Sequence, residues 1–204
     1  MALTKHVVNE LDVLLAIEEY ITNPEDIAMI KKAMTFAREQ HDGQFRKSGD
    51  PYVSHLFSVG HILAELRAGP TTIIAGILHD VIEDTEATKE FVEKEFSEEI
   101  ATIVESVSKI GYIQFKDEKE YLAENHRKIF IAMAKDIRVL LVKLVDRPHN
   151  MRTLEFQPEY KQKKIAKETL EVYAPIAHRL GISEIKNELE DLSFQYLHRE
   201  KYYE

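Results

Sequence analysis

The sequence contains no cysteine, and it has only 7 glycines and 6 prolines among its 204 residues. The missing cysteine excludes disulfides, thiolate metal sites and a cysteine nucleophile, and it fits a reducing, cytoplasmic location. The scarcity of glycine and proline favours long helices with short connections. No apolar run approaches the roughly 20 residues that span a membrane, and residues 1–10 lack the basic and then apolar order of a signal peptide.

Basic charge is also scarce relative to acidic charge, and the net charge is −9 at pH 7. This balance argues against bulk nucleic-acid binding, which relies on a basic surface. A local basic patch could still bind a small anionic ligand. Hydrophobic residues make up 44% and charged residues 31% of the chain, which is ordinary for a soluble globular protein. The length fits one large domain, or one domain with an appended element.

Apolar residues recur at helical spacing along most of the chain, and no stretch alternates as a strand would. Residues 42–51 contain two glycines and one proline and are predicted to be a loop. The sequence therefore predicts an all-α fold. Caps and helix breakers divide it into helices at 4–20, 24–41, 52–67, from 71 onward, after Thr88, after Ser97, 118–134, 137–154, 158–181 and 183–197.

One apolar segment ends in a cluster of ionisable residues. The run that begins at Ile73 ends in His79 and Asp80, and Glu83 and Asp84 follow one helical turn later. In a continuous helix residues four apart share a face, so His79 would lie near Glu83 and Asp80 near Asp84. Buried carboxylates are costly unless they are paired or bind a metal ion. A divalent cation is the simplest explanation for this cluster.

Two residues outside this segment are candidates to complete a metal site. His55 lies near the start of a predicted helix, and Asp146 follows an apolar run in which a charge is otherwise hard to justify. Two imidazoles and two carboxylates suit Mn²⁺, Fe²⁺ or Zn²⁺ better than Ca²⁺. Taken singly, each histidine is more often an ordinary core or surface residue. A second His-Asp pair, His41-Asp42, leads into the loop, and we assign it no metal role.

Several longer motifs extend this pattern. They are Arg-Lys-Ser-Gly-Asp-Pro-Tyr (46–52), Leu-His-Asp-Val-Ile-Glu-Asp-Thr (78–85), Glu-Asn-His-Arg-Lys (124–128) and Asp-Arg-Pro-His-Asn-Met-Arg-Thr (146–153). In this order they resemble the hydrolase domain of the RelA/SpoT homologues, within the HD-domain superfamily of metal-dependent phosphohydrolases. Residues 177–181 and 188–192 are similar to the segment that leads towards the synthetase in the long members.

The resemblance implies an all-α HD-domain bundle of roughly nine to eleven helices. It implies a hydrolase domain over residues 1–180 and the start of a helical linker, over 181–204, towards an absent synthetase domain. The aromatic residues at the end of the chain also lack the polar character of a finished terminus. We therefore expect a piece of a longer protein, whose synthetase and regulatory regions would be its partners and would make any ribosome contact. No direct nucleic-acid binding and no membrane association are expected.

The resemblance also implies a reaction, the manganese (Mn²⁺)-dependent hydrolysis of guanosine tetra- and pentaphosphate, (p)ppGpp, the alarmones of the stringent response. The 3′-pyrophosphate is released to leave GDP or GTP. The resemblance implies that the metal is bound by His55, His79, Asp80 and Asp146. It also implies that Glu83 and Asp84 handle the attacking water. It assigns substrate binding to Arg46, which packs on the guanine, and to Lys47, Ser48, Asn150 and Thr153.

One position departs from the family. Pro148 stands where the family usually has a bulky apolar residue, and a proline inside a helix costs roughly 3 kcal/mol if the loss is not relieved. We therefore expect the helix to bend or to end early there, which would change the aim of Asn150. At spacings of four and seven, Asp146, Asn150 and Thr153 would otherwise share one helix face.

Two alternatives to an active alarmone hydrolase stay open. One is a regulatory domain that binds the alarmone without cutting it, which only Pro148 favours. The other is an HD phosphohydrolase that acts on another nucleotide, against which residues 46–48 argue.

Overall fold

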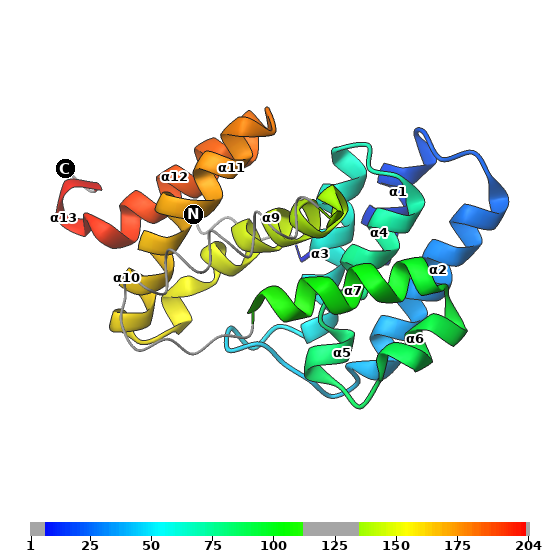
Figure 1. Ribbon diagram of the computed structural model, residues 1–204. Coiled ribbons are helices and arrows are strands. Elements are labelled where there is room, and N and C mark those ends of the chain that lie inside the picture. Colours follow the sequence, from blue (N-terminus) through cyan, green and yellow to red (C-terminus); the bar gives the residue numbers. More distant parts are fainter. Residues whose placement is uncertain (1–6, 112–134, 203–204) are drawn as a thin grey trace. The chain divides into compact units, whose positions relative to one another are not determined.

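The computed structural model describes residues 7–111 and 135–202. The predicted helix at 118–134, with the motif at 124–128, lies outside the described residues. The chain divides into two compact units, residues 1–111 and 112–204. Among the described residues the structure is helical, and the strand-like pairing is a single bridge between Phe45 and Pro51 (Figure 1). The predicted all-α fold is confirmed.

The helices of the first unit include one largely apolar helix, α4. They are α1 (Glu10–Glu18), α2 (Pro24–Gln40), α3 (Tyr52–Glu65), α4 (Pro70–Ile77), α5 (Val81–Asp84), α6 (Lys89–Glu95) and α7 (Glu98–Gly111). Helix α4 packs against α2, α3 and α7 (Figure 1). Every residue from Thr72 to Ile77 is buried, as expected for a helix that is apolar on all sides. The His79-Asp80 pair follows directly after this central helix.

Two glycines let α3 and α4 approach closely. A Cβ atom added at Gly76 would lie 2.2 Å from Leu63 Cδ1, and one added at Gly60 would lie 2.7 Å from Ile77 Cγ1. Both distances are far shorter than the roughly 3.5–4.0 Å at which carbon atoms pack. The absence of side chains at these two positions therefore sets how α3, which carries His55, lies against α4.

Most helices begin where capping residues predicted. The side chains of Asn23, Thr88, Ser97 and Asp136 each accept a hydrogen bond from a backbone N–H two or three residues further on. The first helix is an exception, because it begins at Glu10 and not at residue 4. Asn9 caps it, and Asp12 accepts a hydrogen bond from the Asn9 N–H in return. Residues 7–9 therefore precede the helix, which corrects the predicted start.

The second unit is also helical. It contains α9 (Ile137–Arg152), the 3-10 helix η1 (Leu154–Phe156), α10 (Glu159–Glu168), the π-helical turn η2 (Thr169–Tyr173), α11 (Ala174–Arg179), α12 (Ser183–Leu197) and α13 (Arg199–Tyr202). Helix α12 packs against α9, α10, η2 and α11. Pro148 is buried inside α9, which continues to Arg152. Of the two expected outcomes, an early end of the helix is therefore wrong, and a bend stays a prediction.

No helix in the two described stretches is both long enough and apolar enough to cross a membrane.

Candidate metal centre

The His79-Asp80 pair lies in a turn and not in a continuous helix. Helix α4 ends at Ile77, residues 78–80 form the turn, and α5 begins at Val81. The Gly76 carbonyl, which would accept from the Asp80 N–H in a continued helix, accepts a hydrogen bond from the His79 ring at Nδ1 over 2.7 Å. The predicted continuous helix is therefore wrong at this point, because the imidazole takes up a helical acceptor.

This hydrogen bond decides which nitrogen of His79 can bind a metal. A carbonyl oxygen only accepts, so Nδ1 carries a proton, and in the neutral imidazole the lone pair is then on Nε2. Nε2 lies 3.1 Å from Asp80 Oδ2. A lone pair and a carboxylate oxygen at this distance repel each other unless a cation lies between them. The local geometry therefore suits a metal ion.

His55 joins the pair from α3. Its Nε2 lies 3.7 Å from Asp80 Oδ2, and one ligand atom from each of His55, His79 and Asp80 lies within 4.8 Å of the others. Both histidines are almost completely buried, at 1% and 0% side-chain exposure. Buried neutral imidazoles beside a carboxylate are typical divalent-metal ligands. The structure thus brings together three of the four predicted ligands in a group that could hold a metal ion.

Tyr52 connects this group to the acidic residues of α5. Its hydroxyl lies 2.8 Å from Asp80 Oδ2 and 2.7 Å from Asp84 Oδ2. Asp80 and Asp84 are therefore neighbours, as predicted. Burial and the two carboxylates raise the pKa of Tyr52 far above its ordinary value of 10.0, so the hydroxyl stays protonated and donates.

Sequence reasoning assigned Tyr52 no role, although the residue closes the 46–52 motif. The available signal was its position three residues before His55, which puts both side chains on one face of α3. The two rings do meet edge to face, with centroids 5.9 Å apart. Glu83 and Asp84 lie at the surface on α5 and Asp80 is only partly buried, so the burial of the preceding apolar run does not extend over the whole acidic cluster.

The predicted guanine-binding segment forms an ordered turn. The Arg46 N–H donates to the Asp50 carbonyl and the Gly49 N–H donates to the Arg46 carbonyl, both over 2.9 Å. Gly49 has a φ of +90°, a conformation that favours glycine. The Ser48 hydroxyl donates to the Asp50 carboxylate over 2.7 Å. Lys47 is exposed at the tip.

The remaining predicted site residues lie in the second unit. Asp146 is buried in α9, and its Oδ1 accepts a hydrogen bond of 2.6 Å from Asn150 Nδ2. Lys143 Nζ lies 3.7 Å from the other carboxylate oxygen. Thr153, at the end of α9, donates to the His149 carbonyl over 3.3 Å. That Asp146 is a fourth metal ligand, and that Asn150 and Thr153 contact substrate, remain predictions.

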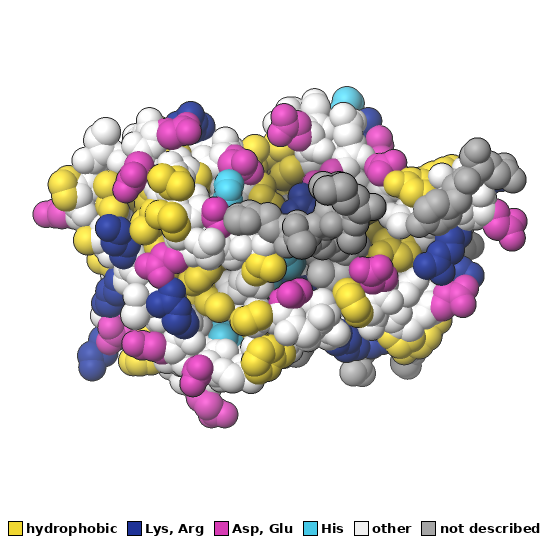
Figure 2. Space-filling model, turned by 180° about the vertical axis from the view of Figure 1, so that it is seen from behind, with side chains coloured by type: hydrophobic (Ala, Val, Ile, Leu, Met, Phe, Trp, Pro, Cys, Tyr) yellow, Lys and Arg dark blue, Asp and Glu magenta, His cyan; other side chains and the backbone are white. Residues whose placement is uncertain are grey.

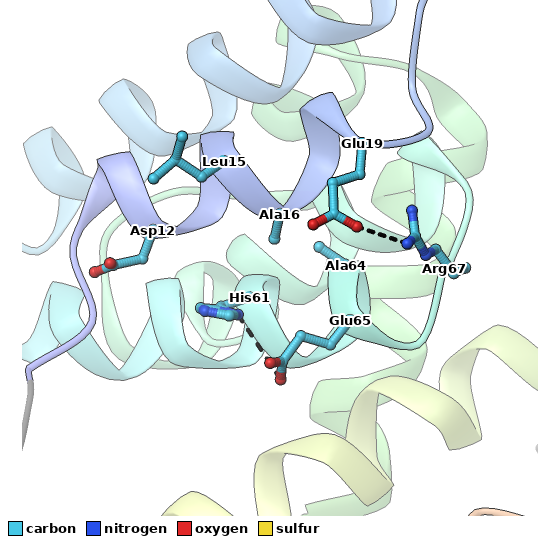
Figure 3. A pocket seen from close by; sticks show the side chains of 8 residues that line it. All are labelled: Asp12, Leu15, Ala16, Glu19, His61, Ala64, Glu65 and Arg67. Atoms are coloured by element: carbon cyan, nitrogen blue, oxygen red, sulfur yellow. Dashed lines mark hydrogen bonds and ion pairs between the residues drawn. The ribbon is translucent and has the colours of Figure 1, made fainter.

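A groove of about 430 Å³ lies between α1 and α3 (Figure 3). It is lined by Asp12, Leu15, Ala16, Glu19, His61, Ala64, Glu65 and Arg67. Its charged groups pair along its walls, because Arg67 donates to Glu19 over 2.6 Å and His61 Nδ1 lies 3.8 Å from Glu65. No predicted site residue lines it, so the groove is separate from the candidate metal centre.

The described side chains on the face shown in Figure 2 mix both signs of charge, with Lys and Arg interspersed among Asp and Glu.

The HD domain family model matches residues 33–183 of the chain. The chain therefore belongs to the HD domain family. Among individual relatives, the bifunctional (p)ppGpp synthase/hydrolase SpoT of Escherichia coli is 51% identical over 180 residues, which is 88% of this chain and 26% of that protein. The guanosine-3′,5′-bis(diphosphate) 3′-pyrophosphohydrolase of Vibrio cholerae is 49% identical over 185 residues, or 91% of this chain and 26% of that protein.

The chain thus spans about a quarter of the length of the curated relatives that it matches. Among solved structures, a metazoan orthologue of SpoT, described as hydrolysing ppGpp and acting in starvation responses, superimposes with a TM-score of 0.62 at 27% sequence identity. The match covers 86% of this chain and 97% of that one.

Proposed function

We propose that this chain is the hydrolase part of a bifunctional alarmone enzyme. It would release the 3′-pyrophosphate of guanosine tetra- and pentaphosphate and leave GDP or GTP. The observation that carries the proposal is the group of two buried histidines, His55 and His79, with the partly buried Asp80, set within an HD domain about half identical to proteins named for this reaction. We further propose that the hydrolase domain covers residues 1–180, that 181–204 begin a linker to a synthetase, and that the enzyme is cytoplasmic.

The proposed metal is Mn²⁺, held by His55, His79 and Asp80, with Asp146 as the fourth ligand. When bound, a divalent ion lowers the pKa of water towards neutrality and so makes a nucleophile available. Glu83 or Asp84 then orients that water or accepts its proton. Their position on the exposed α5 supports this role, because water and substrate can reach them.

The proposed substrate contacts begin in the ordered turn. Arg46 stacks its planar guanidinium on the guanine, Lys47 meets phosphate as a point charge, and Ser48 lies beside them. Asn150 and Thr153 supply further nucleotide contacts. Any ribosome contact is made by regions of the longer protein.

The decisive experiment is a hydrolysis assay on the purified chain with saturating Mn²⁺ and chromatographic identification of the products. We expect pyrophosphate and GDP from the tetraphosphate. Asp80→Ala should lose metal binding and turnover together. Asp42→Ala is the matched control, because it changes the acid of the other His-Asp pair and should leave both intact.

Folded protein that shows no turnover with saturating Mn²⁺ would refute the proposal. Nucleotide binding without product would favour a regulatory domain instead, although its one supporting feature, Pro148, does not interrupt α9. Faster cleavage of a different nucleotide in a substrate panel would point to another HD phosphohydrolase.

A further inference from the structure

We propose that Tyr52 is a positioning residue for the metal centre, and that its hydroxyl holds Asp80 and Asp84 in a fixed relation to each other. The inference rests on the proposed function, in which Asp80 binds the metal and Asp84 handles the attacking water. A ligand and a proton acceptor that serve the same water must keep a constant separation. Tyr52 is placed to set it.

The geometry at the hydroxyl is the first argument. A phenol carries a single proton, yet Asp80 Oδ2 and Asp84 Oδ2 lie 2.8 and 2.7 Å from the same oxygen. The two carboxylates therefore share one donor. They come from different elements, since Asp80 is in the turn after α4 and Asp84 is the last residue of α5. Tyr52 belongs to α3, outside the segment that carries Asp80 and Asp84, and its hydroxyl connects the two carboxylates.

The fixed position of the Tyr52 ring is the second argument. The ring stacks on His41, with centroids 4.8 Å apart and planes 6° from parallel, and it meets His55 edge on. His41 is 3% exposed, and its Nδ1 lies 2.8 Å from Gln44 Oε1. A ring held between two buried imidazoles cannot swing away. The His-Asp pair that was assigned no metal role therefore supplies a supporting ring for the centre.

Gln44 provides a second attachment for Asp84. The Gln44 side chain donates from Nε2 to the Asp84 backbone carbonyl over 3.0 Å. The Gln44 backbone carbonyl accepts from the Tyr52 N–H, also over 3.0 Å. Asp84 is thus held at its carboxylate by Tyr52 and at its backbone by Gln44. Gln44 belongs to the loop that carries Arg46, so the turn proposed to bind guanine is attached to the acidic helix.

If the Tyr52 hydroxyl had a purely structural role, its removal would mainly lower the stability of the fold. Asp84 is exposed and water would solvate its carboxylate in the absence of Tyr52, so the hydrogen bond adds little to stability. What the bond does is restrict the direction in which each carboxylate points. Removing it should therefore change metal binding and turnover far more than the melting temperature.

The test is Tyr52→Phe on the full chain, with Tyr20→Phe as the matched control. The Tyr20 hydroxyl also donates one hydrogen bond, to the Ala68 carbonyl over 2.8 Å, but far along the chain from the metal residues. The Mn²⁺ dissociation constant is measured by calorimetry without substrate, and kcat and KM for ppGpp are measured separately. Loss of an outer-shell partner costs about 10–100-fold in metal affinity or activity.

We expect Tyr52→Phe to weaken Mn²⁺ binding about tenfold and to lower kcat by at least as much, with KM changed less than about threefold. Tyr20→Phe should leave all three values within about twofold of the parent. If the Mn²⁺ affinity of Tyr52→Phe is also within about twofold of the parent, the proposal is overturned. If the parent binds Mn²⁺ but shows no turnover, the proposed function fails, while the affinity comparison still decides the role of Tyr52.

A second variant covers the case in which Tyr52→Phe does not fold. His41→Leu fills a similar volume but removes the flat ring on which Tyr52 stacks. It should weaken Mn²⁺ binding by at least about threefold, and an unchanged affinity would overturn the proposal in the same way.

Discussion

Replacement of Arg147 by methionine tests how the second unit is held together. The Arg147 guanidinium carbon lies 3.7 Å from the centre of the Tyr173 ring, and Nη2 lies 3.5 Å from Glu168 Oε1. The Arg147 and Glu168 side chains are only 13% and 9% exposed. Burial alone would lower the pKa of Arg147, but Tyr173 and Glu168 outweigh it and raise that pKa. The guanidinium therefore stays charged inside the fold.

The expected loss follows from this burial. Methionine preserves much of the apolar stem but leaves the Glu168 carboxylate buried without this cation, which costs about 3–5 kcal/mol. Arg152, on the same helix, provides the control. It bonds Glu188 through two nitrogens over 2.6 and 2.9 Å, but these side chains are 41% and 32% exposed. An exposed pair is worth about 0.2–1 kcal/mol, so the two variants should differ by roughly 2 kcal/mol or more.

Urea unfolding followed by far-ultraviolet circular dichroism gives the free energy of unfolding of the parent, R147M, R152M and the double variant R147M/E168M. The double variant should recover much of the loss, because an apolar pair can replace a buried ion pair at little cost. Equal losses in R147M and R152M would refute the argument from burial. A double variant less stable than R147M would show that the two charges do not depend on each other.

Three further outcomes are expected. Asp136→Ala removes the N-cap of α9 and should cost about 1 kcal/mol of stability at pH 7. Hydrogen bonds from Arg138 hold the pKa of Asp136 below its ordinary value of 3.8. The stability that the cap contributes is therefore fully present above pH 3.8 and is lost as the pH falls through the lowered pKa. Urea curves for parent and variant should therefore converge as the pH falls below the lowered pKa of Asp136, and a constant gap would exclude the ionised cap. Glu83→Gln should bind Mn²⁺ and ppGpp in calorimetry yet lose turnover, and a fully active variant would remove Glu83 from the mechanism. Mn²⁺ at 100 times its dissociation constant should stabilise the parent by about 2.7 kcal/mol in thermal unfolding. A chelator, or the substitution His79→Ala, should abolish this gain in stability. An equal gain in His79→Ala would place the ion elsewhere.

The features that the sequence predicted well are local ones. The Asn23 and Asp136 caps depend on a side chain and a backbone N–H two residues away, and Thr88 on one three residues away. Such contacts form within one segment, so residue type and spacing are enough to predict them. The all-α fold follows in the same way from apolar spacing.

The features that were missed depend on the tertiary structure. The turn after α4 contains no glycine or proline that would interrupt the helical pattern, and it forms where His79 takes up the Gly76 carbonyl. The link from Tyr52 to Asp80 and Asp84 spans 28 and 32 residues of sequence. The stack of His41 on Tyr52 likewise requires the loop to fold back. A pattern of spacings carries no information about these contacts.

The π-helical turn at Thr169–Tyr173 has a consequence for chain length. The Ala174 N–H donates to the Thr169 carbonyl five residues back, so this turn holds one residue more than an α-helical turn. One extra residue shifts the phase of the following helix by about 100° relative to the preceding one. Deleting any one residue here would restore α-helical geometry and turn α11 away from α12, or Tyr173 away from Arg147. The length of this segment is therefore fixed, and it should not accept the loss or gain of a single residue.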